Sequence, residues 1–480
     1  MTLLDPIDFG DNPYLVGPHA PIRKELDQPD LKVVGQVPND FSGIYLRNGP
    51  NQIHPPRGTY HWFDGDGMVH GAEFAEGRVS YRNKWINTKG LRQEQKIGQS
   101  LWPGLMDSPD RSLNEAWGSD RWLKDNSNTD LTIHAGRAIS TFYQCGEAYA
   151  IDPLSLETLG TLDLLSGGGR LMSAHCMTDE QTGDLLFFDY AAKPPYMTYG
   201  VFNKDVNLVH HTAIDLPGAR LPHTLAFTTN YSILMDLPMF WDPELLQKDV
   251  HKVSFYPDKA SRFGLITRYG DGESIKWFEA DPCYIYHAIN AWEEGNEVVL
   301  DVCRMSTPVP SEAKKQRLAG PYGSMLAWLK LDASYHRYRF NLVSGETKEN
   351  TLSDLLSEFP VINNRFGGLP SRYSYHVTLA DTDAILFDGL VKIDSKTTQH
   401  QEYKFPEGCF GSESQFAPRK NAQSEDDGYL ITLVTNMKTG KGEIQIFPAE
   451  DLTRGPICCV IVPQQIPPGF HSSFVLPENL

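Results

Sequence analysis

The chain has 480 residues with 43 basic and 61 acidic side chains, and its formal charge of −18 at pH 7 argues against nucleic acid or another polyanion as a partner. Apolar residues make up 40 % of the chain and charged residues 22 %, so it can bury a sizeable core and is not intrinsically disordered. The length suits one large domain or two to three ordinary ones.

The N-terminal segment MTLLDPIDFGDNPYLVG has neither the basic start nor the continuous apolar core of a secretory signal. No stretch of about 18 uncharged apolar residues occurs further along, so we expect a cytoplasmic protein without a membrane span. The seven cysteines are an odd set without a CxxC pair. This argues against both a disulfide framework and a zinc–thiolate site.

Short β-strands bounded by turn residues are the dominant pattern from one end to the other. Apolar runs are separated by TG, DG, EEG, DDG and TGKG turns, and sustained helical periodicity is scarce. We expect strands within residues 77–86, 147–164, 183–192, 231–238, 297–305, 383–394, 428–436 and 442–452. The fold class predicted is all-β.

The strands are evenly spread, and no linker rich in Ser, Pro or Gly divides them. This favours one closed architecture, a β-propeller, formed by residues 1–480 as a single domain. Residues 148–160 and 443–455 share a weak likeness, without a strict repeat of roughly 40 to 50 residues. The surplus length is predicted to form cap insertions of loops and short helices at about 87–133 and 306–333.

Four of the 15 histidines lie among apolar or small residues, each at the start of a predicted strand. They are His175, His223, His287 and His471. A buried imidazole must find a partner to replace water, and one shared metal ion would satisfy all four. The pattern alone leaves open that they are four separate core histidines, and His134 in DLTIHAGRA fits the same description.

Several short motifs in a fixed order point to one family. The first are RNGPN (47–51), YHWFDGDGMVHG (60–71) and NTD (128–130) followed by His134. His175 follows in SAHCMTDEQTG, then His223, then His287 in HAINAWEEG. The last are SEFP (357–360), SESQFAPR (412–419) and PPGFH (467–471). Together, over about residues 12–478, they resemble the carotenoid cleavage oxygenases, iron(II) enzymes that split alkenes with dioxygen.

The resemblance implies a seven-bladed β-propeller with a cap of loops and short helices over the metal face. It also implies that the four histidines bind Fe(II) and that His134 is structural. Four neutral imidazoles leave one or two coordination positions for dioxygen, and no nicotinamide or P-loop motif accompanies them. Beyond the metal ligands, no side chain is expected to act as acid, base or nucleophile.

The family usually places glutamates behind three of the histidines, where they fix the imidazole tautomers. The pairs that the resemblance implies are Glu358 with His287, Glu413 with His471 and Gln144 with His223. Gln144 stands where a glutamate is expected, so we predict a slightly less electron-rich iron. Glu147 is close by, but an offset of three along a strand points to the opposite face, and it is not expected to serve instead.

Two further departures are local. Thr224 follows His223 where the family commonly has Asp. Ser472 and Phe474 follow His471 where it commonly has Gly and then Trp.

The function implied by the resemblance is oxidative cleavage of a conjugated carbon–carbon double bond of a carotenoid or apocarotenoid, giving two carbonyl products. The position of that bond in an apolar tunnel would select the cut. Candidate tunnel residues are Trp102, Leu105, Phe142, Tyr143, Tyr196, Phe240, Trp241, Tyr284 and Phe366.

Two alternatives stay open. Family members that cleave stilbenoid or phenylpropanoid alkenes typically grip a phenol with Tyr and Lys, whereas Leu105 and Tyr143 stand at these positions here, which favours the carotenoids. The second alternative is a propeller that serves only as an interaction platform, with the histidines in its core and no metal.

The partners expected are an apolar small molecule and dioxygen, not nucleic acid. Because carotenoids lie in membranes, we also expect a peripheral membrane contact. An exposed apolar patch would provide it, formed by residues 101–106 or 239–241.

Overall fold

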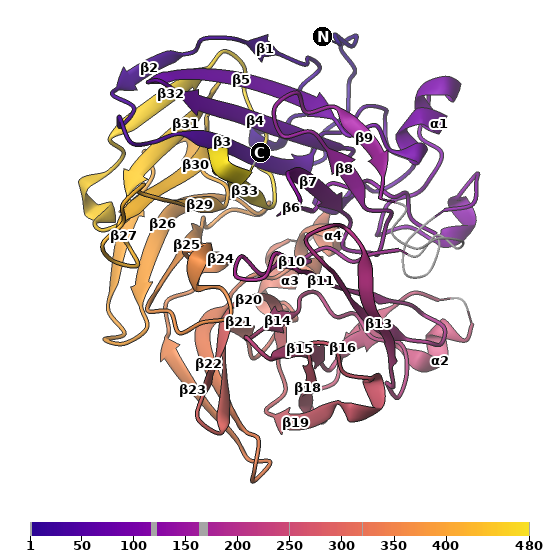
Figure 1. Cartoon of the computed structure of the whole chain (residues 1–480). Helices are drawn as coiled ribbons and strands as arrows, with labels where there is room; N and C mark the ends of the chain where they lie inside the picture. The colour runs from indigo at the N-terminus through magenta and orange to yellow at the C-terminus, as the bar shows by residue number, and fades with distance from the viewer. Residues whose placement is uncertain (1, 117–121, 163–170, 249, 319, 480) are drawn as a thin grey trace.

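The computed structural model describes residues 2–116, 122–162, 171–248, 250–318 and 320–479. Seven antiparallel sheets surround a central axis, which Figure 1 shows nearly end-on. Strands that follow one another in the chain pair within each sheet, as expected for runs joined by tight turns. The prediction of an all-β, seven-bladed propeller is confirmed.

The first four blades follow in chain order, each given from the axis outward. Blade 1 contains β6 (Asp130–His134), β7 (Arg137–Thr141), β8 (Tyr149–Ile151) and β9 (Thr158–Thr161). Blade 2 contains β10 (Met177–Thr178), β11 (Leu185–Tyr190), β12 (Met197–Phe202) and β13 (Leu208–Ile214). Blade 3 contains β14 (Ala226–Phe227), β15 (Tyr231–Asp236), β18 (Ser261–Thr267) and β19 (Lys276–Ala280). Blade 4 contains β20 (Tyr284–Glu294), β21 (Glu297–Met305), β22 (Ser334–Asn341) and β23 (Thr347–Ser353).

The other three blades complete the ring, and a separate hairpin joins β16 (Met239–Trp241) to β17 (Val253–Phe255). Blade 5 contains β24 (Glu358–Val361), β25 (Tyr373–Leu379), β26 (Phe387–Asp394) and β27 (His400–Lys404). Blade 6 contains β29 (Ser414–Pro418), β28 (Cys409–Phe410), β30 (Gly428–Asn436), β31 (Lys441–Pro448), β32 (Cys458–Val462) and β2 (Lys32–Gly35). Blade 7 contains β33 (Ser472–Val475), β3 (Gly43–Pro50), β4 (Gly67–Ala75), β5 (Arg78–Trp85) and β1 (Asp27–Gln28).

Strands from the two ends of the chain close the ring in two blades. The C-terminal strand β33 pairs with β3, with Ser472 opposite Arg47. The N-terminal strand β2 pairs with β32, with Lys32 opposite Ile461. Both contacts join segments more than 400 residues apart, and they remove the open edges that the two end blades would otherwise present.

The predicted strands match the structure closely. Residues 297–305 and 428–436 coincide with β21 and β30, and 77–86 contains β5. Residues 147–164 hold two strands, β8 and β9, up to residue 162, and the last two residues lie outside the described part of the chain. The inner strand β3 is buried along its whole length, whereas the outer strand β27 is partly exposed, with exposed and half-buried residues in alternation.

Helices are short and lie mainly in the cap. The α-helices are α1 (Lys89–Ile97), α2 (Pro243–Leu246), α3 (Glu312–Arg317) and α4 (Gly323–Trp328). The 3-10 helices are η1 (Gly17–His19), η2 (Trp62–Asp64), η3 (Pro109–Arg111), η4 (Gly272–Ser274), η5 (Asn364–Phe366), η6 (Leu452–Arg454) and η7 (Pro477–Asn479). α1 begins where the Thr88 hydroxyl accepts a hydrogen bond from Leu91 N and ends at Gly98, whose φ is +81°.

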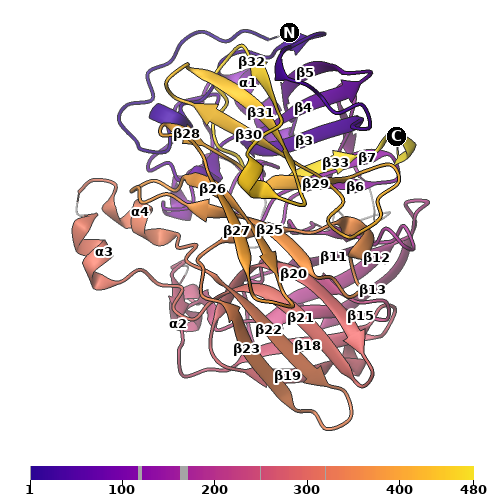
Figure 2. The ribbon, with the colours of Figure 1, turned by 90° about the vertical axis from the view of Figure 1, so that its left-hand side faces the viewer.

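The predicted insertions hold part of this cap. The range 306–333 contains α3 and α4, which extend from one side of the propeller in Figure 2. The range 87–133 contains α1 and η3, but its last residues belong to β6, which begins at Asp130. Residues 117–121 and 319 of these ranges lie outside the described part of the chain.

Buried charges fasten the cap to blade 7. The Lys124 ammonium binds Asp66 at the start of β4 and Glu94 of α1, and all three side chains are almost fully buried. Asp64 accepts hydrogen bonds from the backbone N–H groups of His61 and Leu105, at 2.8 and 2.9 Å. These contacts fix the cap loop that carries Leu105 against the metal face of the propeller.

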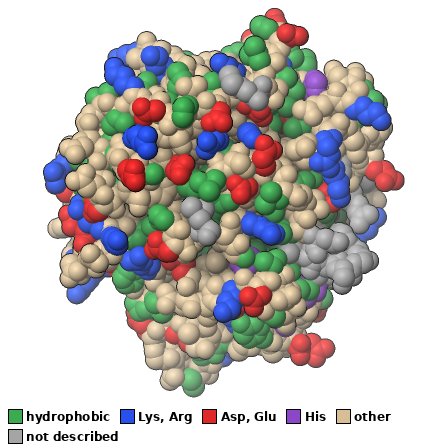
Figure 3. Space-filling model, turned by 45° about the horizontal axis from the view of Figure 1, so that its top comes forward, with side chains coloured by type: hydrophobic (Ala, Val, Ile, Leu, Met, Phe, Trp, Pro, Cys, Tyr) green, Lys and Arg blue, Asp and Glu red, His purple; other side chains and the backbone are tan. Residues whose placement is uncertain are grey.

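The surface is mixed in charge. Acidic and basic side chains are interspersed over the face shown in Figure 3. The two segments expected to contact a membrane do not form the exposed patch that we predicted: Leu101, Trp102, Phe240 and Trp241 are buried in the core of the described structure. Within the described residues, none of the helices has the length and apolar character needed to cross a bilayer.

Candidate metal centre

The innermost strands bring the four predicted histidines to one end of the propeller axis. His175 and His223 precede β10 and β14, His287 lies in the first half of β20, and His471 immediately precedes β33. The blades are built from the axis outward, so their innermost strands run in the same direction and start at the same end.

The four imidazoles converge on one point. The Nε2 atoms of His175 and His223 are 3.0 Å apart, and ligand atoms of His175, His287 and His471 all lie within 4.8 Å of one another. The ring centroid of His175 is 4.5 Å from those of His223 and His471, and 5.0 Å from that of His287. Two nitrogens that bind one ion at about 2.1 Å and at right angles lie about 3.0 Å apart, so this spacing suits a shared transition metal.

Two of the predicted carboxylate partners hold their histidines through Nδ1. His287 Nδ1 lies 2.5 Å from Glu358 Oε2, and His471 Nδ1 lies 2.9 Å from Glu413 Oε1. An Nδ1–H donated to a carboxylate leaves the Nε2 lone pair free for a metal. His287 Nε2 is buried and has no hydrogen-bond partner in the described structure, as a metal-binding nitrogen would require.

Burial keeps most of the cluster neutral. It lowers the pKa values of His175, His223 and His287 well below the usual range, and the neighbouring imidazoles add to the effect. Burial opposes a charge on His471, but the carboxylates of Glu413, Asp130 and Glu358 together outweigh it and raise that pKa. Burial raises the pKa of Glu358 to about 8, and a cation bound by His287 would favour its ionised form.

The backbone at the site is strained in two places. His175 has φ of +63° and Phe359, which follows Glu358, has φ of +51°. Such conformations cost roughly 1–3 kcal/mol and persist where surrounding contacts impose them. Here Asp130 Oδ2 accepts the His175 N–H at 3.0 Å, and Glu358 Oε2 accepts the Phe359 N–H at 2.6 Å.

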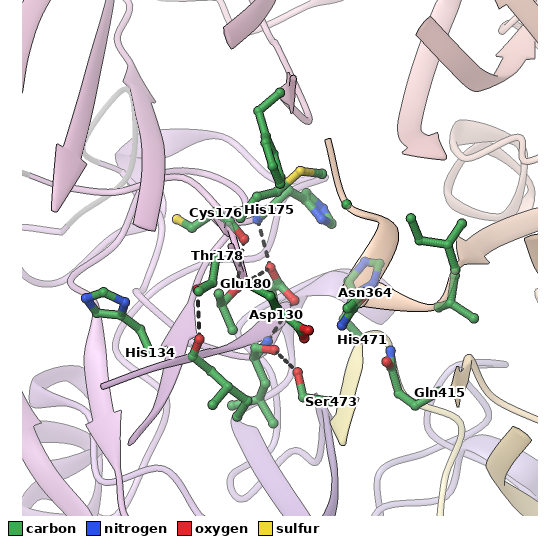
Figure 4. Close-up of a pocket in the computed structure, with 18 of the residues that line it drawn as sticks. Asp130, His134, His175, Cys176, Thr178, Glu180, Asn364, Gln415, His471 and Ser473 are labelled. Carbon is green, nitrogen blue, oxygen red and sulfur yellow. Dashed lines mark hydrogen bonds between the residues drawn. The ribbon is translucent and has the colours of Figure 1, made fainter. Parts of the chain in front are cut away.

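The remaining predicted residues lie nearby in different settings. Gln144 and His223 line the same apolar cavity. His134 lines the wall of the polar channel that also reaches His175 and His471, and Figure 4 shows it apart from these two histidines.

A polar channel of about 520 Å³ reaches the cluster along the propeller axis. It is lined by the innermost strands and includes His175, His287 and His471 at its inner end. Figure 4 shows Asp130 between the strands that carry His175 and His471, with Gln415 and Ser473 on the same wall.

The cap side of the cluster is aromatic and more tightly filled. A cavity of about 20 Å³ lies against His223, His287 and His471, and its other walls include Phe63, Phe359 and Phe470. A second cavity of about 70 Å³ continues past His223 and is walled by rings that include Trp122, Tyr286 and Trp328.

The predicted tunnel residues do not share one cavity. Leu105, Tyr143, Trp241 and Tyr284 line the 70 Å³ cavity beside His223. Trp102 and Phe142 line a different cavity of about 30 Å³, together with the charged Asp64 and Lys124. Phe366 lies in η5, where its carbonyl accepts a hydrogen bond from Asn290, a residue of the axial channel. Tyr196 packs in the core of blade 2, and Phe240 stacks on Tyr256 at 4.5 Å.

Comparison with known proteins decides the family. The family described as retinal pigment epithelial membrane protein matches residues 19–476. Carotenoid 9,10(9′,10′)-cleavage dioxygenase 1 of Phaseolus vulgaris is 32 % identical over 501 residues, which cover 97 % of this chain and 90 % of that protein. The chain belongs to the carotenoid cleavage oxygenase family. Another member of the family, isoeugenol monooxygenase of Pseudomonas nitroreducens, is 28 % identical over 486 residues, with 97 % and 98 % coverage.

Solved structures of carotenoid cleavage oxygenases share the fold. Lignostilbene dioxygenase of Pseudomonas brassicacearum superposes with a TM-score of 0.83 at 24 % identity, covering 98 % of this chain and all of that chain. A cobalt-substituted Synechocystis apocarotenoid oxygenase gives a TM-score of 0.81 at 24 % identity, with 95 % and 97 % coverage.

Asp130 is a residue of the site that the sequence analysis did not single out. It begins β6, lines the axial channel and contacts the backbone of His175. The available signal was small: the motif around it reads NTD where the family block reads NTN.

Proposed function

We propose that the protein is a non-haem iron(II) dioxygenase that cleaves a conjugated double bond of a carotenoid or apocarotenoid to two carbonyl products. The observation that carries the proposal is the convergence of four buried imidazoles, with two held through Nδ1 by carboxylates. Neutral nitrogen donors suit a divalent first-row metal such as Fe(II), which supplies the chemistry that joins dioxygen to an alkene.

The chain's own residues would hold and orient the reactants. His175, His223, His287 and His471 would bind the metal, while Glu358 and Glu413 fix two of the rings. The rings of Phe63, Tyr143, Tyr286 and Phe359 exclude water from the cap side and offer an apolar surface to an alkene.

The aromatic walls and the absence of the expected phenol-binding pair support a polyene as substrate. Leu105 and Tyr143 line the cavity at the two positions where the resemblance expects the Tyr and Lys of a phenol-binding pair. A stilbenoid or phenylpropanoid alkene is the second candidate. It is favoured by the Tyr143 hydroxyl, which is buried beside the Gln144 side chain and lines a cavity where a hydroxylated ring would bind.

Product analysis tests the proposal. The protein loaded with Fe(II) is incubated under oxygen with carotenoids, apocarotenals and hydroxystilbenes, and the aldehydes are identified by mass. We expect aldehydes from a polyene and none from a matched His287→Ala variant. Aldehydes from hydroxystilbenes alone would show that the substrate is a stilbenoid and not a carotenoid. A folded protein that binds no metal and cleaves no alkene would support the interaction platform instead.

A further inference from the structure

A ring of titratable groups lies around the starts of the seven innermost strands. Each blade contributes one member, from His223, three residues before β14, to His287, three residues into β20. In blade order they are Asp130, His175, His223, His287, Glu358, Glu413 and His471. Four members are the proposed metal ligands and two are their carboxylate partners. Asp130 occupies the seventh place.

Asp130 lies against His175, the one ligand for which the resemblance supplies no carboxylate. Its Oδ2 accepts the His175 N–H at 3.0 Å, and its Oδ1 accepts the Leu131 N–H at 2.8 Å. The residue is only 8 % exposed. With an N–H donor on each oxygen, the group is arranged as a carboxylate and not as a hydroxyl donor.

The contact explains how His175 reaches the cluster. At φ of +63° the backbone of His175 leaves the extended conformation just before β10 begins. The hydrogen bond to Asp130 satisfies the buried N–H that this turn removes from the sheet, and so offsets part of the strain. Moving Asp130 would therefore move the His175 ring.

Asp130 also changes the charge of the site. The position expected for a third glutamate holds the neutral Gln144, which lies on the cap side with His223. Asp130 lies on the channel side, where burial and the Glu413 carboxylate raise its pKa, while His471 and the two backbone N–H donors oppose that shift. A bound cation would favour the ionised form of Asp130. A carboxylate next to the ligands stabilises a bound cation through Coulomb attraction in a poorly solvated interior.

We propose that Asp130 is a positioning residue for His175 and the third carboxylate of the metal site, in compensation for the neutral Gln144. This inference rests on the proposed iron site. Together with Glu358 and Glu413, Asp130 gives the site three carboxylates around four neutral imidazoles. Their combined negative charge exceeds the positive charge of a divalent ion by one unit. Asp130 then restores the negative charge that Gln144 lacks, and the less electron-rich iron predicted from Gln144 alone is no longer expected.

Substitution of Asp130 with matched controls tests the inference. We compare wild type, Asp130→Asn, Asp130→Asn/Gln144→Glu and Glu180→Gln, since Glu180 lines the same channel without belonging to the ring. Fe(II) and Co(II) affinities are measured by titration under nitrogen, the Fe(III)/Fe(II) midpoint potential by redox titration, and folding of the metal-free protein by thermal unfolding.

We expect Asp130→Asn to weaken Fe(II) binding about tenfold or more and to raise the midpoint potential. The added Gln144→Glu should return the potential toward wild type, because it restores the charge, and Glu180→Gln should change neither quantity. Should Asp130→Asn fail to fold, Asp130→Ser, which keeps one acceptor for the His175 N–H, is measured in its place with the same expectations.

Unchanged affinity and potential in a folded Asp130 variant would overturn the inference, as would an equal effect of Glu180→Gln. Those results leave the iron site itself intact. A wild-type protein that binds neither Fe(II) nor Co(II) would overturn the proposed function and this inference with it.

Discussion

The channel side and the cap side of the histidine cluster differ in size and chemistry. The channel side opens into about 520 Å³ and is lined by polar groups such as Asp130, Glu413 and Gln415. The cap side holds cavities of about 20 and 70 Å³ walled mainly by aromatic rings. The channel side carries the charges that would hold an ion, and the cap side carries the surface that would select an alkene.

The difference follows from how each side is built. The channel is formed by the starts of the innermost strands, whose positions are fixed by sheet hydrogen bonds throughout seven blades. The cap consists of loops and short helices fastened by a few buried charges. Substitutions on the channel side should therefore change metal binding, and substitutions on the cap side should change substrate choice.

The largest effect is expected at a proposed ligand. His287→Ala removes one nitrogen and leaves the Glu358 carboxyl buried without its partner. We expect metal affinity to fall by at least about a hundredfold, because loss of a partner behind a ligand alone costs 10- to 100-fold. Iron content after dialysis, measured by elemental analysis, checks this. His134→Ala, on the channel wall outside the cluster, should keep its iron; equal loss in both variants would contradict a four-histidine site.

A smaller effect is expected behind a ligand. Glu413→Gln weakens the hold on His471 Nδ1 and on the Ser472 N–H, which lies 2.6 Å from Oε2. We predict a loss of Fe(II) affinity of about 10- to 100-fold, measured by competition with a chelator. Glu443→Gln is the control, because Glu443 is in β31 of the same blade and bonds Asn436 and Gln445. Equal affinities for all three proteins would remove Glu413 from the site.

Two phenylalanines, one on each side of the cluster, test whether the cap side alone determines substrate choice. Phe63 lines both apolar cavities on the cap side, and Phe227 lines the channel. Phe63→Ala should lower kcat/KM for the preferred alkene by about tenfold, roughly the loss of one apolar contact surface, with iron content unchanged. Phe227→Ala should cost about 3 kcal/mol of stability without altering relative rates among substrates. Substrate panels and chemical denaturation measure the two effects, and a changed preference in Phe227→Ala would contradict the division.

The last prediction concerns the fastening of the cap. Burial raises the pKa of Asp64 to about 7, from 3.8 in the unfolded chain. Between about pH 4 and pH 7 the folded state therefore holds a proton on Asp64 that the unfolded state has lost. The contribution of Asp64 to the free energy of unfolding thus declines as the pH rises through this range. Asp64→Asn has no such dependence. Denaturant unfolding of both proteins at pH 4.5, 6 and 7.5 should show wild type losing stability relative to the variant; parallel pH profiles would refute the shift.

Much of the site could be read from the sequence because the ligands sit at strand starts. His175, His223, His287 and His471 stand out by their apolar surroundings, and the motif order adds Glu358 and Glu413. Strand positions were equally accessible, since inner strands such as β21 and β30 are continuous apolar runs between turns.

The rest depends on contacts that no local pattern encodes. The link between Asp130 and His175 joins residues 45 positions apart through a backbone N–H, and it depends on a φ of +63° at a residue other than glycine. The local sequence also does not show on which side of the cluster an aromatic residue lies. Tyr284 and Phe366 are both rings near strands, but only tertiary packing places the first on the cap side and the second beside the channel.

The pairing of β33 with β3 has a consequence for the order of biosynthesis. His471 adjoins β33, whose partner strand is synthesised more than 400 residues earlier. The fourth imidazole is therefore the last of the four to be made, and until it exists Glu413 lacks its histidine. The proposed chelator is complete only when β33 has paired with β3.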